Sequence, residues 1–405
     1  MCFCLSSGRT PMTDRYPEKS VCISGAGQSA VGRPSMRSAL QLTVDACLAA
    51  IADAGLRPSD IDGLTTYPGP VGEGGFSPVG ATETMLALGL TPTWVGASTE
   101  GHAHMGAIIS AIQAIASGLC RHVLVFRTVA EASARMRSRE SSLMGGAGRS
   151  RATRGNAWST PFNALSAAHL YALYAQAYFT KYNATSAQLG AIAVNGRKMA
   201  GLNPNAIYRD PISIDDYLAS RIITSPLRLY DCDTHIDGST AILISHRDVA
   251  RDLPRAPIEI EAMGMALGGI GFGLHRGDFT SLPADAAGKM LWSRTDLTPK
   301  DLDVAQIYDG FSILTLLWME SLSLCKRGEA AAFVEGGTRI GLGGELPMNT
   351  SGGQLSAGRF HGYGHSFEAC EQLWGRAGAR QVPDAKTCVV ANGGFGYGAL
   401  LLKRG

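Results

Sequence analysis

The stretches LRPSDIDGLTTY (residues 56–67) and LTPKDLDVAQIY (residues 297–308) match each other at five offsets, which hold Leu, Pro, Asp, Asp and Tyr. Each copy follows a segment with helical periodicity and leads into a short apolar run that is typical of a strand. Matching residues between the same kinds of predicted element indicate an internal duplication. The sequence therefore predicts two similar halves, and not a catalytic domain joined to an unrelated one.

The segments around these two stretches alternate between short apolar runs and helical patterns. Strands are expected at residues 20–25, 64–67, 94–97, 122–129 and 240–245. Helices are expected at residues 40–51, 82–90, 164–181, 186–199 and 213–220. Alternation of this kind predicts an α/β fold.

This pattern divides the chain into an N-terminal extension (1–19), a first half (20–255) and a second half (256–405). Residues 130–160 carry six arginines among Ser, Ala and Gly, and we expect a long basic loop there. Met12 is a second candidate for the first residue of the protein.

The composition excludes several classes of protein. A net charge of +2 lacks the basic excess of nucleic-acid binders, so we expect no nucleic-acid partner. The nine cysteines form no CxxC pair, which argues against a zinc ribbon and a secreted disulfide framework. A cytoplasmic location is therefore expected. Residues 101–120 contain no charge but are rich in Ala, Gly, Ser and His, so we expect a buried helix and no membrane span.

Several stretches in the two halves resemble the thiolase superfamily, most closely the sterol-carrier-type thiolases. They are SAIQAIASGLCRHVLVF (110–126), DCDTHIDG (231–238), QIYDGFS (306–312), NTSGG (349–353) and QLWGRAGARQV (372–382). Their order and spacing also fit, and the resemblance runs from about residue 20 to the end. It implies the thiolase fold, with a five-layered αβαβα core, and a homodimer.

The departures from the thiolase pattern are informative. Thiolases place a nucleophilic cysteine at the start of the buried helix of the first half, where this chain reads ASTEGHAHMGA (97–107). Cys120 lies at the far end of that helix, and the cysteine near the C-terminus is replaced within ANGGFGYG (391–398). Acyl transfer through a cysteinyl thioester is therefore excluded. The histidine or asparagine of thiolases is replaced by Tyr308, and GRFHGYGHSFEA (358–369) contains another tyrosine.

This combination resembles the thiolase-like retro-aldolases that cleave steroid side chains. The resemblance implies that Tyr308 and Tyr363 carry out the chemistry. It also implies that a β-hydroxyacyl-CoA on a steroid is split into a ketone and a shorter acyl-CoA. A small OB-fold partner protein and a heterotetramer are implied as well. No cofactor is implied, since coenzyme A is part of the substrate.

Retro-aldol chemistry needs a base for the hydroxyl group, donors for the thioester enolate and an acid for the enolate carbon, but no covalent nucleophile. The pKa of a free tyrosine is near 10, so a tyrosine base needs neighbouring donors or positive charge. His361, His365 and helix N-termini are the candidates for this role. Asp309 either orients Tyr308 or caps a helix. Which tyrosine is the base stays open, and Tyr308 as a core aromatic is an alternative because its repeat partner is also a tyrosine.

Two histidines and two glycines are expected to bind the substrate, and two arginines are expected to attract its phosphates. His102 and His104 begin the uncharged helix, and Gly394 and Gly396 belong to a glycine turn that lines the site. Arg149 and Arg151 would attract coenzyme A phosphates. The simpler alternatives are packing histidines and a solvated loop.

Three further interpretations compete with this one. Asp231, Asp233 and His235 have the residue types of a metal site, but their stretch is interpreted as a turn before a strand. Acyl transfer that uses Ser98 or direct attack is a second possible activity. A catalytically silent subunit that binds acyl-CoA or lipid is the third.

Overall fold

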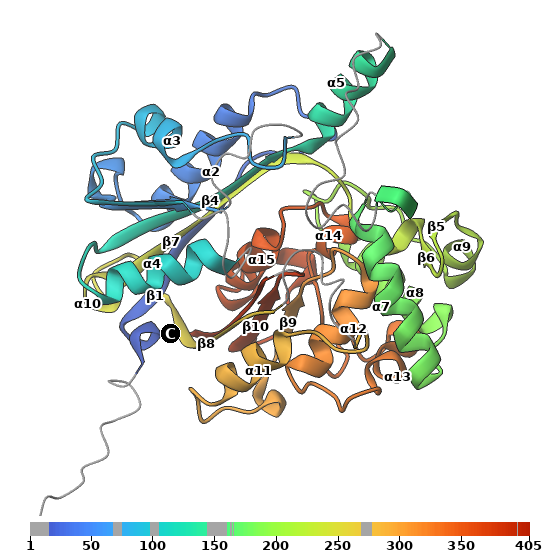
Figure 1. Cartoon of the computed structure of the whole chain (residues 1–405). Coiled ribbons are helices and arrows are strands. Elements are labelled where there is room, and N and C mark those ends of the chain that lie inside the picture. Colours follow the sequence, from blue (N-terminus) through green and yellow to red (C-terminus); the bar gives the residue numbers. More distant parts are fainter. Residues whose placement is uncertain are drawn as a thin grey trace, which may run out of the picture.

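The computed structural model describes residues 16–67, 75–97, 105–143, 160–162, 164, 166–268, 278–394 and 396–405. Figure 1 shows the N-terminal part of the chain, in blue and cyan, beside the C-terminal part, in orange and red.

A mixed sheet of nine strands runs through the described residues in the order β3-β2-β4-β7-β1-β8-β11-β10-β9. Its strands are β1 Val21–Gln28, β2 Gly63–Thr66, β3 Trp94–Ala97, β4 His122–Ala130, β7 Asp237–His246, β8 Ile258–Leu267, β9 Val304–Ile307, β10 Thr387–Asn392 and β11 Gly396–Arg404. A small second sheet pairs β5 Ile222–Thr224 with β6 Leu227–Arg228. The predicted strands are thereby found, with ends shifted by a few residues.

The two halves of the large sheet repeat one arrangement of strands. In the first half β2 pairs with β4 in parallel, and β4 and β7 then pair antiparallel, as do β7 and β1. In the second half β9, β10, β11 and β8 follow each other with the same directions. In the first half, β3 pairs with the outer side of β2. In the second half no strand pairs there among the described residues, and Met348 forms a parallel bridge to Ala305 of β9 instead. The predicted duplication is therefore present in the structure.

Helices form three layers, and the two half-sheets lie between them. The outer helices of the first half are α2 Ala39–Asp53 and α3 Ala81–Leu88. The middle helices are α4 Gly106–Ala116 and α15 Tyr363–Leu373, whose buried residues share a core with strands of both halves. The outer helices of the second half include α11 Ala284–Trp292 and α12 Ser312–Ser321. This gives the five layers αβαβα that the sequence predicted (Figure 1).

The remaining helices surround these layers. They are α5 Glu131–Leu143, α7 Ala167–Tyr182, α8 Ser186–Gly201, α9 Ile214–Ala219, α10 Arg247–Ala250, α13 Ala330–Val334 and α14 Gly353–Ser356. One prediction is wrong here: part of the expected loop at 130–160 is α5, which extends away from the body of the molecule (Figure 1). Residues 131–143 contain neither Gly nor Pro, and Glu131 lies in the first turn, so the local sequence favours a helix.

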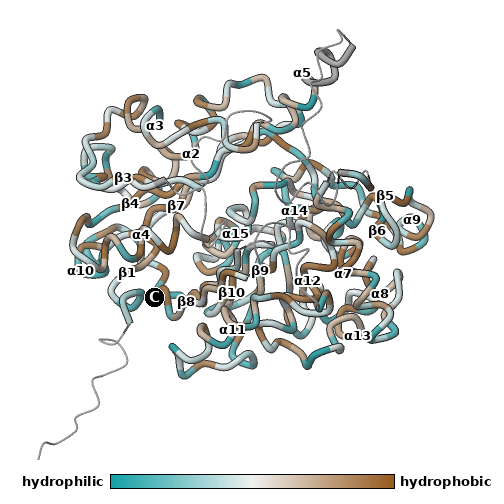
Figure 2. The backbone as a smooth tube through the Cα atoms, in the orientation of Figure 1, coloured by the Kyte–Doolittle hydropathy of each residue, from teal (hydrophilic) through white to brown (hydrophobic). Residues whose placement is uncertain are grey.

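The uncharged helix predicted near residues 101–120 is observed as α4. Eight of its eleven residues are buried, whereas Ser110 is half-buried and Gln113 and Ala116 are exposed. Figure 2 shows α4 and the neighbouring strand β7 as predominantly hydrophobic. Among the described residues, no helix combines the length and the apolar character that crossing a membrane requires.

Glycines allow the outer helices to lie directly on the sheet. A Cβ atom on Gly25 of β1 would lie 2.4 Å from the carbonyl oxygen of Ala50 in α2. A Cβ atom on Gly264 of β8 would lie 2.0 Å from the carbonyl oxygen of Ala287 in α11. The two halves thus use a glycine for the same close approach, which accounts for part of the glycine content.

The aspartates of the repeated stretch accept equivalent backbone hydrogen bonds in the two halves. The carboxylates of Asp60 and Asp301 accept the backbone N–H groups at the start of their own 3₁₀ turns, from Arg57 and Thr298, both at 2.8 Å. The second aspartate of each copy binds the start of the adjacent parallel strand. Asp62 accepts from the N–H groups of residues 121 and 122, and Asp303 from those of residues 386 and 387.

Replacing Asp303 should loosen the second half at this junction. Asp303→Ala leaves the N–H groups of Lys386 and Thr387 without their acceptor, so we expect a loss of about 2–3 kcal/mol in the free energy of unfolding. The midpoint of urea unfolding measures this loss. The exposed Asp296→Ala serves as the control, and equal midpoints for the two variants would contradict the structural role of the repeat.

Candidate functional site

The two predicted tyrosines lie at the carboxyl end of β9 and at the start of α15. Tyr308 follows β9, and its backbone N–H donates to the carbonyl oxygen of Ala391 in β10 at 3.0 Å. Tyr363 is the first residue of α15, where unpaired backbone N–H groups favour negative charge. Both side chains are buried, with exposed fractions of 7% and 0%.

A left-handed turn brings the chain into α15. His361 and Gly362 have φ angles of 51° and 85°. A Cβ atom on Gly362 would lie 1.8 Å from the amide nitrogen of Asn392, so no larger residue fits there. That amide nitrogen donates to the carbonyl oxygen of His361 at 3.2 Å. The end of β10 therefore fixes the turn that places Tyr363.

The hydroxyl group of Tyr363 has no hydrogen-bond partner among the described residues although it is buried. Burial raises the pKa of Tyr363, and the positive charge of Arg127 opposes that rise. Arg127 lies in the middle of β4 and carries no local signal that sets it apart in the sequence. Its exposed fraction is 0%, and its Nε atom has no partner among the described residues.

Arg127 is held by aromatic and imidazole groups. Its guanidinium lies 4.7 Å from the ring centre of Phe76, and its Nη2 atom is 2.6 Å from Nδ1 of His361. Arginine only donates, so Nδ1 of His361 accepts, and Nε2 carries the proton and faces Glu131 at 3.7 Å. The His361 ring also packs on Phe76, with ring centres 4.4 Å apart. His361 thus connects Arg127 to the next group of charges.

That group is an arginine between two carboxylates. Arg359 forms a two-pronged ion pair with Glu131, with Nε 2.9 Å from Oε2, and its Nη1 is 3.1 Å from Oδ1 of Asp233. Burial raises the pKa of Asp233 to about 7, although Arg359 works against it. Burial likewise raises the pKa of Tyr308, and the negative charge of Asp233 adds to that rise. Tyr308 thus lies near both a carboxylate and the cation of Arg359, whereas the charged group near Tyr363 is the cation of Arg127.

Asp309 and His365 act together beneath the site. Asp309 accepts the backbone N–H groups of Gln354 and Leu355 at the start of α14, at 2.9 and 3.4 Å. Nε2 of His365 lies 3.0 Å from the same carboxylate. Of the two roles considered for Asp309, the structure shows the helix cap. His365 then ties α15 to α14.

The glycine turn between β10 and β11 is anchored by aromatic donors. The indole N–H of Trp318 donates to the carbonyl oxygen of Gly393 at 3.0 Å. The hydroxyl groups of Tyr171 and Tyr397 donate to the carbonyl oxygen of Gly394 at 2.9 and 3.0 Å. Gly396 begins β11 and pairs with Leu267 of β8. Two phenols thus hold the carbonyl oxygen of Gly394, and burial raises the pKa of Tyr171 well above its ordinary value.

Several predicted residues lie outside the described residues. They are Ser98, His102, His104, Arg149 and Arg151.

The two aspartates that were considered as metal ligands bind protein groups instead. Asp231 accepts a hydrogen bond from the hydroxyl of Tyr217 at 2.8 Å, and Asp233 pairs with Arg359.

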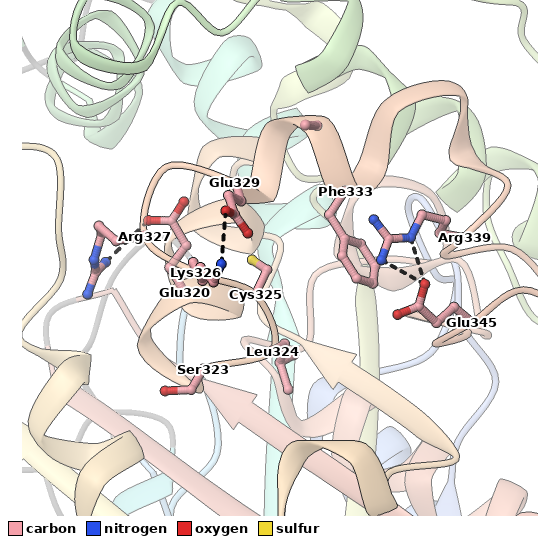
Figure 3. Close-up of a pocket in the computed structure, with 11 residues that line it drawn as sticks. Glu320, Ser323, Leu324, Cys325, Lys326, Arg327, Glu329, Phe333, Arg339 and Glu345 are labelled. Atoms are coloured by element: carbon pink, nitrogen blue, oxygen red, sulfur yellow. Dashed lines mark hydrogen bonds and ion pairs between the residues drawn. The ribbon is translucent and has the colours of Figure 1, made fainter.

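A groove of about 770 Å³ lies elsewhere, on the surface of the second half (Figure 3). Its charged side chains neutralise each other: Arg339 pairs with Glu345, and Lys326 with Glu329. None of the candidate site residues lines it.

Comparisons with known proteins relate this chain to a protein family. Residues 274–400 match the family model described as thiolase C-terminal domain-like. The chain is 34% identical over 390 residues to the steroid side-chain-cleaving aldolase of Thermomonospora curvata, a match that covers 92% of this chain and 95% of that protein. It is 35% identical over 363 residues to the 17-hydroxy-3-oxo-4-pregnene-20-carboxyl-CoA lyase of Mycobacterium tuberculosis, covering 87% of this chain and 91% of that one.

A solved structure of an Ltp2-ChsH2(DUF35) aldolase has a TM-score of 0.84 and 33% identity, and the match covers 95% of this chain and 98% of that chain. The chain belongs to the thiolase superfamily. The predictions of the family and of the thiolase fold are thereby confirmed. The similarity of this chain to enzymes named aldolase and lyase covers most of its length.

The described cysteines of this thiolase-like protein are poor nucleophiles. Cys120 follows α4 at its carboxyl end, and burial raises its pKa to about 12. Cys388 lies inside β10, and burial raises its pKa well above the ordinary value. A thiolate is the reactive form, so these buried thiols stay inert.

Removing Arg359 should leave two carboxylates buried without their cation. We expect Arg359→Met to lower the free energy of unfolding by about 3–5 kcal/mol, as measured by denaturant unfolding. Arg57→Met removes an exposed ion pair with Asp60 and should change little. Equal effects of the two substitutions would show that the Arg359 cluster does not hold the site together.

Proposed function

We propose that this protein is a carbon–carbon lyase that cleaves a β-hydroxyacyl-CoA thioester by retro-aldol chemistry. The observation that carries the proposal is the pair of buried tyrosines, Tyr308 and Tyr363, in a thiolase fold. The buried thiols and the cysteine-free stretch at residues 97–107 support a reaction without a covalent intermediate.

The reaction divides between a base and an acid. The base removes the proton of the β-hydroxyl group, and the O–H electron pair forms a ketone. The bond between Cα and Cβ breaks, and its electron pair moves to Cα as a thioester enolate. The acid then protonates Cα, which releases a shorter acyl-CoA. Two tyrosines are sufficient for both proton transfers, and no cofactor enters the balance.

The substrate that we propose is a steroid with a CoA-activated side chain. The names of the relatives from Thermomonospora curvata and Mycobacterium tuberculosis support this choice. The coenzyme A phosphates would meet the arginines of residues 149 and 151, and the acyl part would meet His102, His104 and the glycine turn at Gly394 and Gly396.

We further propose a homodimer that binds a small OB-fold partner as a heterotetramer in the cytoplasm. The aldolase structure that pairs Ltp2 with ChsH2(DUF35) supports a partner subunit. The assay described next therefore uses the chain co-expressed with a small OB-fold protein, and the mass of the purified complex in solution tests the assembly.

Tyr308→Phe and Tyr363→Phe should each reduce kcat for ketone release by at least about 100-fold, because each removes one proton-transferring group. Ketone and acyl-CoA products are measured on several β-hydroxyacyl-CoA thioesters. Folding and partner binding should survive, since phenylalanine keeps the ring.

Tyr182→Phe, at the end of α7, is the matched control and should keep full activity. Full activity of both Tyr308→Phe and Tyr363→Phe would overturn the assignment. Tight binding of the thioesters by the wild-type complex without any turnover would overturn the enzymatic function itself.

A further inference from the structure

Gln354 connects the two segments that carry the tyrosines. Its backbone N–H donates to Oδ1 of Asp309, the residue after Tyr308, at 2.9 Å. Its side-chain Oε1 accepts from the backbone N–H of Gly362, the residue before Tyr363, at 3.0 Å. The exposed fraction of Gln354 is only 2%. One buried side chain thus joins the end of β9 to the start of α15.

The hydroxyl group of Tyr308 lies beside the same side chain. A Cβ atom on Gly310 would be 3.0 Å from the Tyr308 hydroxyl oxygen, so the ring folds back over Gly310. The carbonyl oxygen of Gly310 accepts from the backbone N–H of Asp233 at 3.3 Å. The next N–H along the chain, that of Thr234, donates to the carbonyl oxygen of Gln354 at 3.0 Å. These contacts place Gln354 next to the phenol, and its amide opposes the burial that raises the pKa of Tyr308.

The amide nitrogen of Gln354 is left as a buried donor. A backbone N–H only donates, so the bond from Gly362 fixes Oε1 as the acceptor and leaves Nε2 with two N–H groups. Nε2 has no hydrogen-bond partner among the described residues. An unpaired buried donor is costly, so its retention indicates an acceptor that binds there. Asn392 holds the same turn through Nδ2, but its own unpaired atom is Oδ1, which cannot donate.

The thioester oxygen of the substrate is the acceptor that the reaction provides. When the bond between Cα and Cβ breaks, its electron pair forms an enolate, and the negative charge moves onto that oxygen. A fixed donor that points at a developing oxyanion stabilises the transition state strongly in a site without water. The β-hydroxyl oxygen, by contrast, becomes the oxygen of a neutral ketone and gains no charge over the reaction.

We propose that Gln354 is a catalytic residue whose Nε2 donates to the thioester oxygen and stabilises the enolate that forms there. This inference rests on the proposed function and adds the donor for the enolate to it. It does not depend on which tyrosine is the base, because the donor acts on a different atom of the substrate.

A buried water is the other acceptor that the structure offers. A cavity of about 30 Å³ borders Gln354, His365 and Glu368, and neither Tyr308 nor Tyr363 lines it. That volume has room for a water molecule. A hydrogen bond from Nε2 to such a water would leave the thioester untouched, so the two acceptors predict different effects of removing the amide.

The first test is the kinetics of Gln354→Met in the complex with the OB-fold protein. We expect kcat for ketone release to fall by about 100- to 1,000-fold with little change in KM, because the lost donor acts on charge that develops in the transition state. Gln176→Met, which replaces an exposed amide on α7, is the control and should keep the wild-type values. An unchanged kcat, or a loss confined to KM, would overturn the inference.

The second test separates the donor from the turn that it also holds. Asn392→Ala removes the bond to the carbonyl oxygen of His361, so it loosens the same turn and leaves the Gln354 amide in place. Acetyl-CoA labelled with ¹³C at its carbonyl is bound to each complex, and the infrared band of that carbonyl reports the hydrogen bond to its oxygen. We expect the band at lower wavenumber in the wild type and in Asn392→Ala than in Gln354→Met.

The same band position in the wild type and Gln354→Met would overturn the inference and assign Nε2 to the buried water. An equal shift of the band in Gln354→Met and Asn392→Ala would also overturn it, since the turn would then account for the effect. If the wild-type complex cleaves no thioester, the proposed function fails, while the infrared band still decides whether Gln354 donates to a thioester oxygen.

Discussion

The ion-pair cluster of Arg359 with Glu131 and Asp233 connects the two halves of the molecule where the chemistry is placed. Arg359 comes from the second half, and both carboxylates come from the first. The arginine precedes the turn that carries His361 and Tyr363, so the position of that turn depends on the cluster. A buried cluster of this kind is stable only when every member keeps its partner. The geometry around both tyrosines is therefore set by contacts between the halves.

The duplicated fold supplies the rest of the site. The end of β9 presents Tyr308, and its counterpart in the first half, the end of β2, presents Tyr67 near Arg127. The middle helix α15 presents Tyr363 at its start. The scaffold of the thiolase superfamily thus offers the end of a strand and the start of a helix, and this chain places a phenol at each of them. Burial raises the pKa of both phenols. Asp233 adds to that rise at Tyr308, and Arg127 opposes it at Tyr363.

Much of the fold could be predicted from the sequence, because its signals are local or repeated. The aspartates of residues 60 and 301 bind their own turns, and this is why the two stretches look alike. Tyr308 and Tyr363 stood out because they replace expected residues within recognisable motifs. Arg127 could not be singled out, since an arginine in an apolar strand carries no local signal and its partner His361 lies 234 residues away. The helix α5 was missed because its arginines suggested a solvated loop, whereas its lack of Gly and Pro favoured a helix.

Bond cleavage, as we propose it, proceeds from two tyrosines without a covalent acyl-enzyme. The most direct measurement is the stoichiometry of one cleavage, followed by mass spectrometry of products and protein together. We expect each β-hydroxyacyl-CoA to give one ketone and one shorter acyl-CoA, with no free coenzyme A consumed and no acyl group on the protein. A requirement for free coenzyme A, or an acylated serine or cysteine, would contradict it.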